Sequence, residues 1–164
     1  DLVVLPLNHP PGTTTLERIE SGLRNLIRRC PRPILAVPGI SSNLTSTLLA
    51  YDGSPKAREA LYIAAYIAKR WGTEITVITS EIGLAKPAQT QQEALVYLED
   101  YGIRAHTLPI SQPIAEGLSS AAESGDYDLV LIGGYGTTPV IEAFLGSAVD
   151  QVLREVKIPI LVCR

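Results

Sequence analysis

The residues best suited to chemistry are glycines and a serine that follow an apolar run late in the chain. They form the pattern Gly133-x2-Gly136-x9-Gly146-Ser147, and a helical pattern begins just after the serine. Glycine lets a backbone approach a ligand closely, and the first N–H groups of a helix attract anions. The serine hydroxyl adds a donor for a phosphate oxygen. The spacing therefore predicts a loop that binds a polyphosphate.

Two better-known phosphate motifs are excluded for this loop. It contains no Gly-Lys-Ser/Thr, so it is not a P-loop, and its glycines do not follow the first strand, as a dinucleotide-binding fingerprint requires. A structural alternative stays open, because glycines also turn a chain tightly and let a helix pack against a strand.

A second candidate is Asp52, which ends an earlier apolar run. Its carboxylate is able to accept a hydrogen bond from an adenine amino group or a ribose hydroxyl. The alternative is that Asp52-Gly53-Ser54-Pro55 is only a turn and helix cap, which is a frequent use of these residue types.

Short aliphatic runs that alternate with helical periodicity must position these loops. The runs predict strands at residues 47–51, 74–79, 103–108, 128–132 and 159–163. Apolar residues at helical spacing predict helices between them, the first capped by Ser54 and the second by a capping box of Thr90 and Glu93. We expect an α/β fold, an open doubly wound five-stranded parallel sheet in the order 3-2-1-4-5. That order brings the loops at residues 52–55 and 133–147 together at the switch point.

The first 40 residues resemble the end of this same unit. Asp1 to Leu5 matches Asp128 to Ile132, and Pro33-Ile34-Leu35 reappears as Pro159-Ile160-Leu161. Ser21 and Arg28 match residues 147 and 154 in the same alignment. We expect residues 1–40 to be the C-terminal part (strand, helix, strand) of a degenerate first repeat in a longer tandem arrangement, and residues 41–164 to be a complete domain.

These motifs resemble the universal stress protein family. The glycine pattern, the strand-ending Asp52-Gly53-Ser54, the strand Asp128 to Gly133 and the closing Ile158 to Val162 all match the family pattern. The resemblance covers residues 43–164 as one domain and residues 1–38 as the end of a preceding one. It implies an adenine nucleotide alpha hydrolase-like fold.

The resemblance also implies a function and a site. It implies an ATP-binding regulatory or stress-response module, with Mg²⁺ as a companion ion and AMP or ADP as alternative ligands. Asp52 would meet the adenine end, the glycines would meet the ribose and phosphates, and Ser147 would bond a phosphate oxygen. The implied nucleotide-binding residues are Ala50, Asp52, Ile132, Gly133, Tyr135, Gly136, Gly146, Ser147 and Ala148.

The sequence departs from this pattern in three places. Val149 stands where nucleotide-binding members often have a second hydroxyl, and the segment from Glu81 to Gln89 is shorter than usual. The partial repeat has Pro6, His9 and Glu20 in place of the three glycines, so we expect it not to bind nucleotide by itself.

Other functions stay open. A degenerate member would bind no nucleotide and serve as an interaction or dimerisation domain, such as the cytosolic tail of a transporter. Catalysis is limited to slow ATP hydrolysis, because no motif places a lysine or arginine near the glycine loop. The last strand is expected to be a sheet edge, covered either by the same strand of a second chain in a homodimer or by residues 34–37.

Composition restricts the partners. The net charge is −3 from 14 basic and 17 acidic residues, without the clustered basic face that nucleic acid requires. The longest apolar run, Ala60 to Ala68, is too short to span a membrane. The two cysteines lack metal-ligand spacing and are expected to be buried thiols. These features favour a cytoplasmic location.

Overall fold

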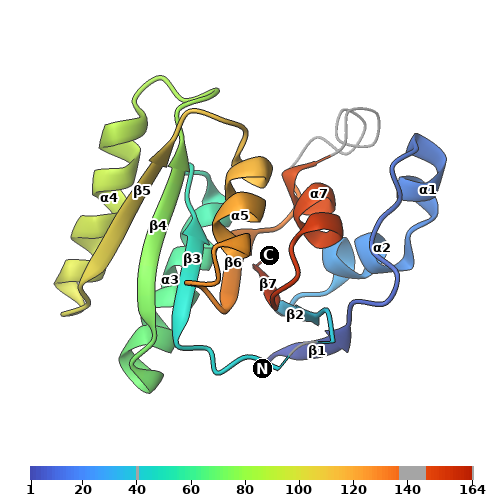
Figure 1. The fold of residues 1–164 in the computed structure, drawn as a ribbon, viewed down its shortest axis with the longest axis horizontal. Coiled ribbons are helices and arrows are strands. Elements are labelled where there is room, and N and C mark those ends of the chain that lie inside the picture. The colour runs from blue at the N-terminus through green and yellow to red at the C-terminus, as the bar shows by residue number, and fades with distance from the viewer. Residues whose placement is uncertain (40, 137–146, 164) are drawn as a thin grey trace.

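The computed structural model describes residues 1–39, 41–136 and 147–163, which form a seven-stranded sheet with helices on both faces (Figure 1). In chain order the elements are β1 (Val3–Pro6), α1 (Thr15–Glu20), α2 (Gly22–Arg29), β2 (Ile34–Val37), β3 (Ser46–Ala50), α3 (Pro55–Trp71), β4 (Glu74–Ser80), α4 (Pro87–Asp100), β5 (Ala105–Ile110), α5 (Ile114–Glu123), β6 (Leu129–Gly133), α7 (Ala148–Glu155) and β7 (Ile160–Cys163).

The strands lie in the order β1-β2-β7-β6-β3-β4-β5. The five strands from β3 onward have the predicted order, with β3 and β6 adjacent at the switch point. All neighbours in the sheet are parallel except β2 and β7. The carboxyl ends of β3 and β6 therefore open at the same edge of the sheet, where ligands bind in doubly wound folds.

Alternating strand residues build a core on each face of the sheet. Leu48 and Val130 point toward α2, α5 and α7, whereas Leu49 and Leu131 point toward α3 and α4. Each strand is thus buried on both sides, which explains why the strands read as continuous apolar runs. The two cores hold the switch-point ends of β3 and β6 in place.

Local sequence explains where the first long helix begins and ends. The Ser54 hydroxyl accepts a hydrogen bond from the Ala57 N–H, Pro55 occupies the first turn of α3, and Gly72 ends the helix with a φ of 73°.

The predicted capping box of Thr90 and Glu93 is wrong. Helix α4 begins at Pro87, and the Thr90 N–H already donates to the Lys86 carbonyl. Proline favours the first helical position because its missing N–H is not needed there. The helix therefore starts a turn earlier than the capping pattern indicates.

Residues 1–37, which we call the N-terminal unit, extend the sheet beyond β7 (Figure 1). β2 pairs antiparallel with β7, and the paired residues are Ile34 with Val162, Leu35 with Leu161 and Ala36 with Ile160. Since residues 34, 35 and 36 match 160, 161 and 162 in the internal repeat, this ladder has local twofold symmetry about Leu35 and Leu161. β7 is paired on one side with β6 and on the other with β2 of the same chain, so residues 34–37 cover the edge of the last strand; the homodimer through that strand stays a prediction.

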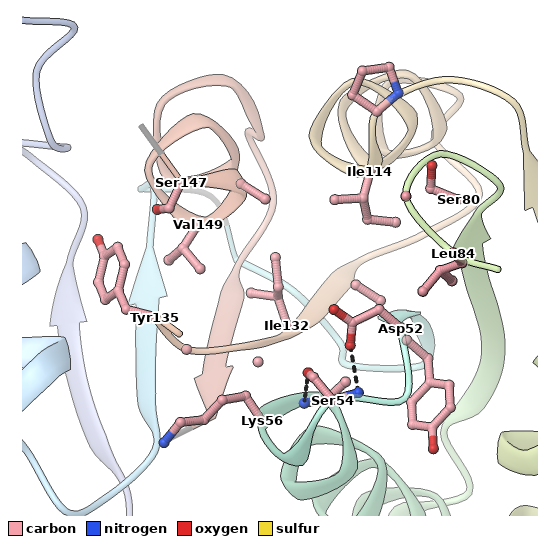
Figure 2. A pocket seen from close by; sticks show the side chains of 18 of the residues that line it. Asp52, Ser54, Lys56, Ser80, Leu84, Ile114, Ile132, Tyr135, Ser147 and Val149 are labelled. Atoms are coloured by element: carbon pink, nitrogen blue, oxygen red, sulfur yellow. Dashed lines mark hydrogen bonds between the residues drawn. The ribbon is translucent and has the colours of Figure 1, made fainter. Parts of the chain in front are cut away.

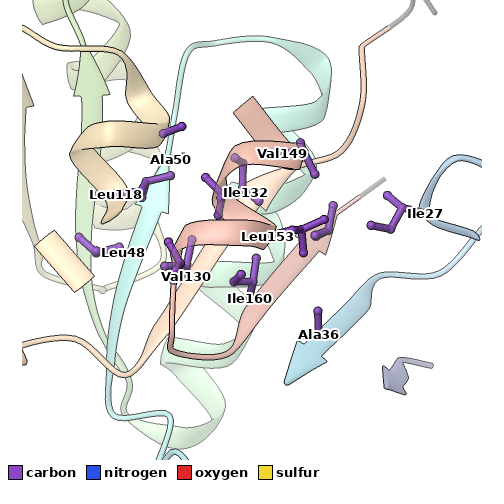
Figure 3. Close-up of a cluster of buried hydrophobic side chains, with 14 of the residues drawn as sticks. Ile27, Ala36, Leu48, Ala50, Leu118, Val130, Ile132, Val149, Leu153 and Ile160 are labelled. Atoms are coloured by element: carbon purple, nitrogen blue, oxygen red, sulfur yellow. The ribbon is translucent and has the colours of Figure 1, made fainter. Parts of the chain in front are cut away.

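The N-terminal unit also shares the core of the rest of the chain. Ile27 of α2 and Ala36 of β2 belong to the same buried cluster as Val149, Leu153 and Ile160 (Figure 3). Helix α2 therefore covers the sheet beside α7.

Several lone residues from the sequence are placed by the structure. Both cysteines are free; Cys163 is buried, as predicted, whereas Cys30 is half-buried. His9 and His106 are exposed. Tyr62 of α3 packs on Tyr97 of α4 with ring centroids 5.1 Å apart, and Tyr97 packs on Tyr101 with ring centroids 4.9 Å apart. Among the described residues, no helix is long and apolar enough to cross a membrane.

Candidate functional site

A cavity of about 440 Å³ opens at the carboxyl ends of β3 and β6, at the predicted switch point (Figure 2). Its lining residues are Ala50, Tyr51, Asp52, Ser54, Lys56, Ala57, Ser80, Ile82, Gly83, Leu84, Pro113, Ile114, Ile132, Gly133, Gly134, Tyr135, Ser147, Ala148 and Val149. The volume lies within the usual range for small-molecule sites.

Asp52 stands at one end of the cavity, in a turn that the local sequence stabilises. Its Oδ1 accepts a hydrogen bond from the Ser54 N–H at 2.9 Å, and Gly53 takes a φ of 76° that favours glycine. Both alternatives from the sequence therefore apply, because the carboxylate forms the turn and is still exposed at the cavity. A carboxylate fixed in this way is an acceptor for hydroxyl or amino groups of a ligand.

Ser147 and the first turn of α7 stand at the other end (Figure 2). The Ser147 hydroxyl accepts a hydrogen bond from the Asp150 N–H at 3.1 Å, so it is the N-cap of α7. The earliest N–H groups of a helix have no acceptor within the helix. The backbone of Ala148 and Val149 therefore offers donors and the positive end of the helix dipole.

Apolar side chains separate these two polar ends. Ile132 and Val149 lie between Asp52 and Ser147, whereas Ile114 stands across the cavity from Asp52 and Leu84 adds to the wall beside it (Figure 2). A planar apolar group with a polar edge fits such a slot better than a fully hydrated ion does.

Two charged side chains are among the described residues that line the cavity. Lys56, in the first turn of α3, adds a positive charge opposite in sign to Asp52, and its side chain points away from the Asp52 carboxylate (Figure 2). Within the described ranges, no group of three or more metal-ligating side chains is present. The chemistry available at this site is hydrogen bonding and charge pairing.

Gly133 lies in close contact with the first turn of α3. A Cβ at this position would lie 2.7 Å from the carbonyl carbon of Lys56 and 2.9 Å from the Ala57 nitrogen. Gly133 therefore lets the end of β6 pack directly against the first turn of α3. For this glycine the packing alternative applies, although the residue also borders the cavity.

Tyr135 borders the cavity but is held from behind by a buried polar cluster. Its hydroxyl donates to Asp150 Oδ1 at 2.6 Å, and Arg24 Nη1 lies 3.7 Å from Asp150 Oδ2. The guanidinium groups of Arg24 and Arg28 lie 5.1 and 5.5 Å from the centre of the Tyr135 ring. The cluster joins α2 of the N-terminal unit to the first turn of α7.

Most of the predicted site residues are brought together. Seven of them line the cavity: Ala50, Asp52, Ile132, Gly133, Tyr135, Ser147 and Ala148. Gly136 is exposed and is not part of the lining, and Gly146 lies outside the described residues.

Sequence reasoning missed Lys56, Ser80, Leu84 and Ile114, all of which line the cavity. A positional signal was available for three of them. Ser80 ends β4, and Lys56 and Ile114 lie in the first turns of α3 and α5, which follow strands. Leu84 lies in the short segment after β4, where no pattern marked it.

A second hollow of about 780 Å³ lies in the N-terminal unit, between the end of β1 and helix α2. It is lined in part by His9 and by two carboxylates, Glu17 and Glu20. Acidic side chains disfavour phosphate, so this hollow is a poor match to the first cavity despite its equivalent place in the repeat.

Comparison with known proteins identifies the family. The model of the universal stress protein family matches residues 45–164. The chain belongs to the universal stress protein family. A universal stress protein of Synechocystis is 25% identical over 170 residues, and a universal stress protein of Methanocaldococcus jannaschii is 27% identical over 132 residues.

Solved universal stress protein structures share the fold. One from Archaeoglobus fulgidus superposes with a TM-score of 0.81 at 21% identity and covers 99% of this chain. A second, solved in complex with cAMP, has a TM-score of 0.66 at 22% identity, and it covers 76% of this chain and 98% of its own. The chain spans 58% of the length of the Synechocystis relative and 60% of the A. fulgidus protein.

Proposed function

We propose that this universal stress protein chain binds an adenine nucleotide, with ATP as the first candidate, in the cavity between Asp52 and Ser147. The observation that carries the proposal is the polarity of the cavity: a carboxylate at one end, an apolar slot in the middle and a capped helix N-terminus at the other end. This sequence of groups matches a base and ribose followed by phosphates.

In the proposed complex, Asp52 accepts hydrogen bonds from the adenine amino group or the ribose hydroxyls. Ala50, Ile132 and Ile114 contact the base, and the Ser147 hydroxyl and the N–H groups at the start of α7 donate to phosphate oxygens. Lys56 adds a positive charge at the same cavity. The relative solved with cAMP supports the choice of an adenine nucleotide. ADP and AMP are alternative ligands, and Mg²⁺ would accompany the phosphates.

A second candidate function is an interaction domain that binds no nucleotide. Val149 favours it, because this buried apolar side chain borders the cavity where a hydroxyl would serve a phosphate better. Catalysis stays a secondary prediction, limited to slow ATP hydrolysis. A cytoplasmic location and a role in stress response are also predictions.

We further propose that residues 1–40 are the last part of a first repeat and residues 41–164 a complete domain. The twofold register of β2 and β7 supports this division. Arg154 supports it as well, since its Nη1 donates to the carbonyls of Pro11 and Gly12 at 3.3 and 3.2 Å and so ties α7 to the N-terminal unit.

Isothermal titration with ATP tests the proposed function. We expect one site, and we expect Asp52→Ala to weaken binding about tenfold or more, because a hydrogen bond to a charged group contributes about 1.5–3 kcal/mol. Asp126→Ala is the matched control, since Asp126 is an exposed acid before β6, at the opposite edge of the sheet. ATP binding that is equally strong in Asp52→Ala and in the control would contradict the proposed pose, and the absence of any binding would favour the interaction domain.

A further inference from the structure

Asp150 is a fully buried carboxylate in the first turn of α7. Its residue exposure is 0%, and its own N–H donates to the Ser147 hydroxyl that caps the helix. The carboxylate therefore lies within one helical turn of the N–H groups assigned above to the phosphates.

A buried negative charge at that place opposes the binding of an anion. Charges interact more strongly in a protein interior than in water, because the surroundings screen them less. The favourable dipole at a helix N-terminus amounts to only about half a unit charge. An uncompensated Asp150 would thus cancel much of the attraction that α7 offers to phosphate.

The compensating charge comes from the N-terminal unit. Arg24 of α2 is 3% exposed, and its Nη1 lies 3.7 Å from Asp150 Oδ2. Among the described residues, the two terminal nitrogens of Arg24 have no hydrogen-bond acceptor. Asp150 Oδ2 likewise has no hydrogen-bond donor there. At this distance Arg24 acts on Asp150 mainly through its charge.

The internal repeat gives the pairing a second, independent basis. Residue 24 corresponds to residue 150 when the copies are aligned at the separation of 126 that relates Ser21 to Ser147. The two residues thus lie at equivalent positions of the two copies and face each other where the N-terminal unit meets α7. They carry opposite charges, so the N-terminal unit contributes a cation at the position where α7 has a carboxylate.

We propose that Arg24 is a positioning residue of the nucleotide site: it neutralises Asp150 from the neighbouring repeat and so allows the N-terminus of α7 to accept phosphate. The inference rests on the proposed function, and it makes the affinity for phosphates, but not for the nucleoside, depend on the N-terminal unit.

The test compares ATP with adenosine in three variants of the full chain. Arg24→Met removes the cation paired with Asp150 and is expected to weaken ATP binding about tenfold, the order of one partly screened unit charge at short range. Asp150→Asn leaves Arg24 uncompensated and is expected to tighten ATP binding by a similar factor. The double variant Arg24→Met/Asp150→Asn is expected to bind ATP about as the parent does. Adenosine, which has no phosphate, is expected to bind all four proteins equally.

The pattern separates electrostatics from simple loss of structure. Loss of structure would weaken adenosine and ATP together, and it would not make Asp150→Asn bind ATP more tightly. If Arg24→Met does not fold, the ATP affinities of Asp150→Asn and of the double variant still test whether the charge of Asp150 opposes phosphate binding. Equal ATP affinity in the parent and Asp150→Asn, or a parallel change for adenosine, would overturn the inference. If the parent binds neither ligand, the proposed function fails first, and this inference fails with it.

Discussion

At the scale of single residues, Gly133 combines packing with the shape of the site. Its Cα lies against the backbone of Lys56 and Ala57, so a methyl group at this position meets atoms that belong to a helix and are unable to swing aside. We predict that Gly133→Ala lowers the free energy of unfolding by about 1–3 kcal/mol, the usual cost of overpacking. Chemical denaturation followed by circular dichroism measures this loss.

Gly22→Ala is the matched control for that experiment. Gly22 opens α2, and a Cβ there has no neighbour within 4 Å. Alanine favours a helix over glycine by about 1 kcal/mol, so this variant is expected to be neutral or more stable. Equal stability of Gly133→Ala and the parent would show that the contact with α3 is not needed.

Some contacts between single residues were predictable from the sequence, and others were not. Asp52, Ile132 and Ser147 were predictable as neighbours because the carboxyl ends of parallel strands meet at a switch point. The pairing of Arg24 with Asp150 was not predictable, because it depends on how two segments pack together. Neither residue type indicates a partner 126 positions away. The contact of Gly133 with α3 was hidden for the same reason, since a glycine pattern does not reveal which neighbour requires the missing side chain.

At the scale of elements, α7 and α2 offer a matched pair of helix caps. Ser147 caps α7 and Ser21 caps α2, each through a hydrogen bond from the backbone N–H three residues later. Replacing either serine with alanine is expected to cost about 1 kcal/mol of stability. Only Ser147 lines the cavity, so only Ser147→Ala is expected to weaken ATP binding, by about tenfold.

Thermal unfolding and ATP titration of both cap variants check this prediction. An equal loss of affinity in Ser21→Ala and Ser147→Ala would mean that the caps act on the ligand only through stability.

Helix boundaries were less predictable than helix positions: α4 begins at Pro87, although Thr90 and Glu93 have the spacing of a cap. Local motifs compete, and the proline takes the first helical position.

At the scale of the whole molecule, the seven strands are expected to behave as one sheet. β2 pairs with β7, and Ile34 and Ala36 belong to the same core as Val130 and Ile160. We predict that the amides of β2 exchange with deuterium nearly as slowly as those of β3, independent of protein concentration. Rapid exchange in β2 alone would show that the N-terminal unit opens separately, and protection that increases with concentration would show that the strands pair between chains.

The architecture itself was largely predictable. Alternating strands and helices indicated the doubly wound sheet, and the internal repeat indicated that residues 34–37 are able to cover the last strand. The sequence did not show whether residues 34–37 or a second chain would pair with the last strand, because either partner would form the same twofold ladder. The structure shows the pairing with residues 34–37 of the same chain.

The most direct test of nucleotide binding at the switch point is to map ATP on the chain by NMR chemical-shift perturbation. We predict that the largest shifts fall on the amides of residues 52–54, 56–57, 132–135 and 147–149 around the first cavity, with small shifts around the hollow near His9 and Glu20. Shifts centred on that second hollow, or no shifts at millimolar ATP, would contradict nucleotide binding at the switch point of the sheet.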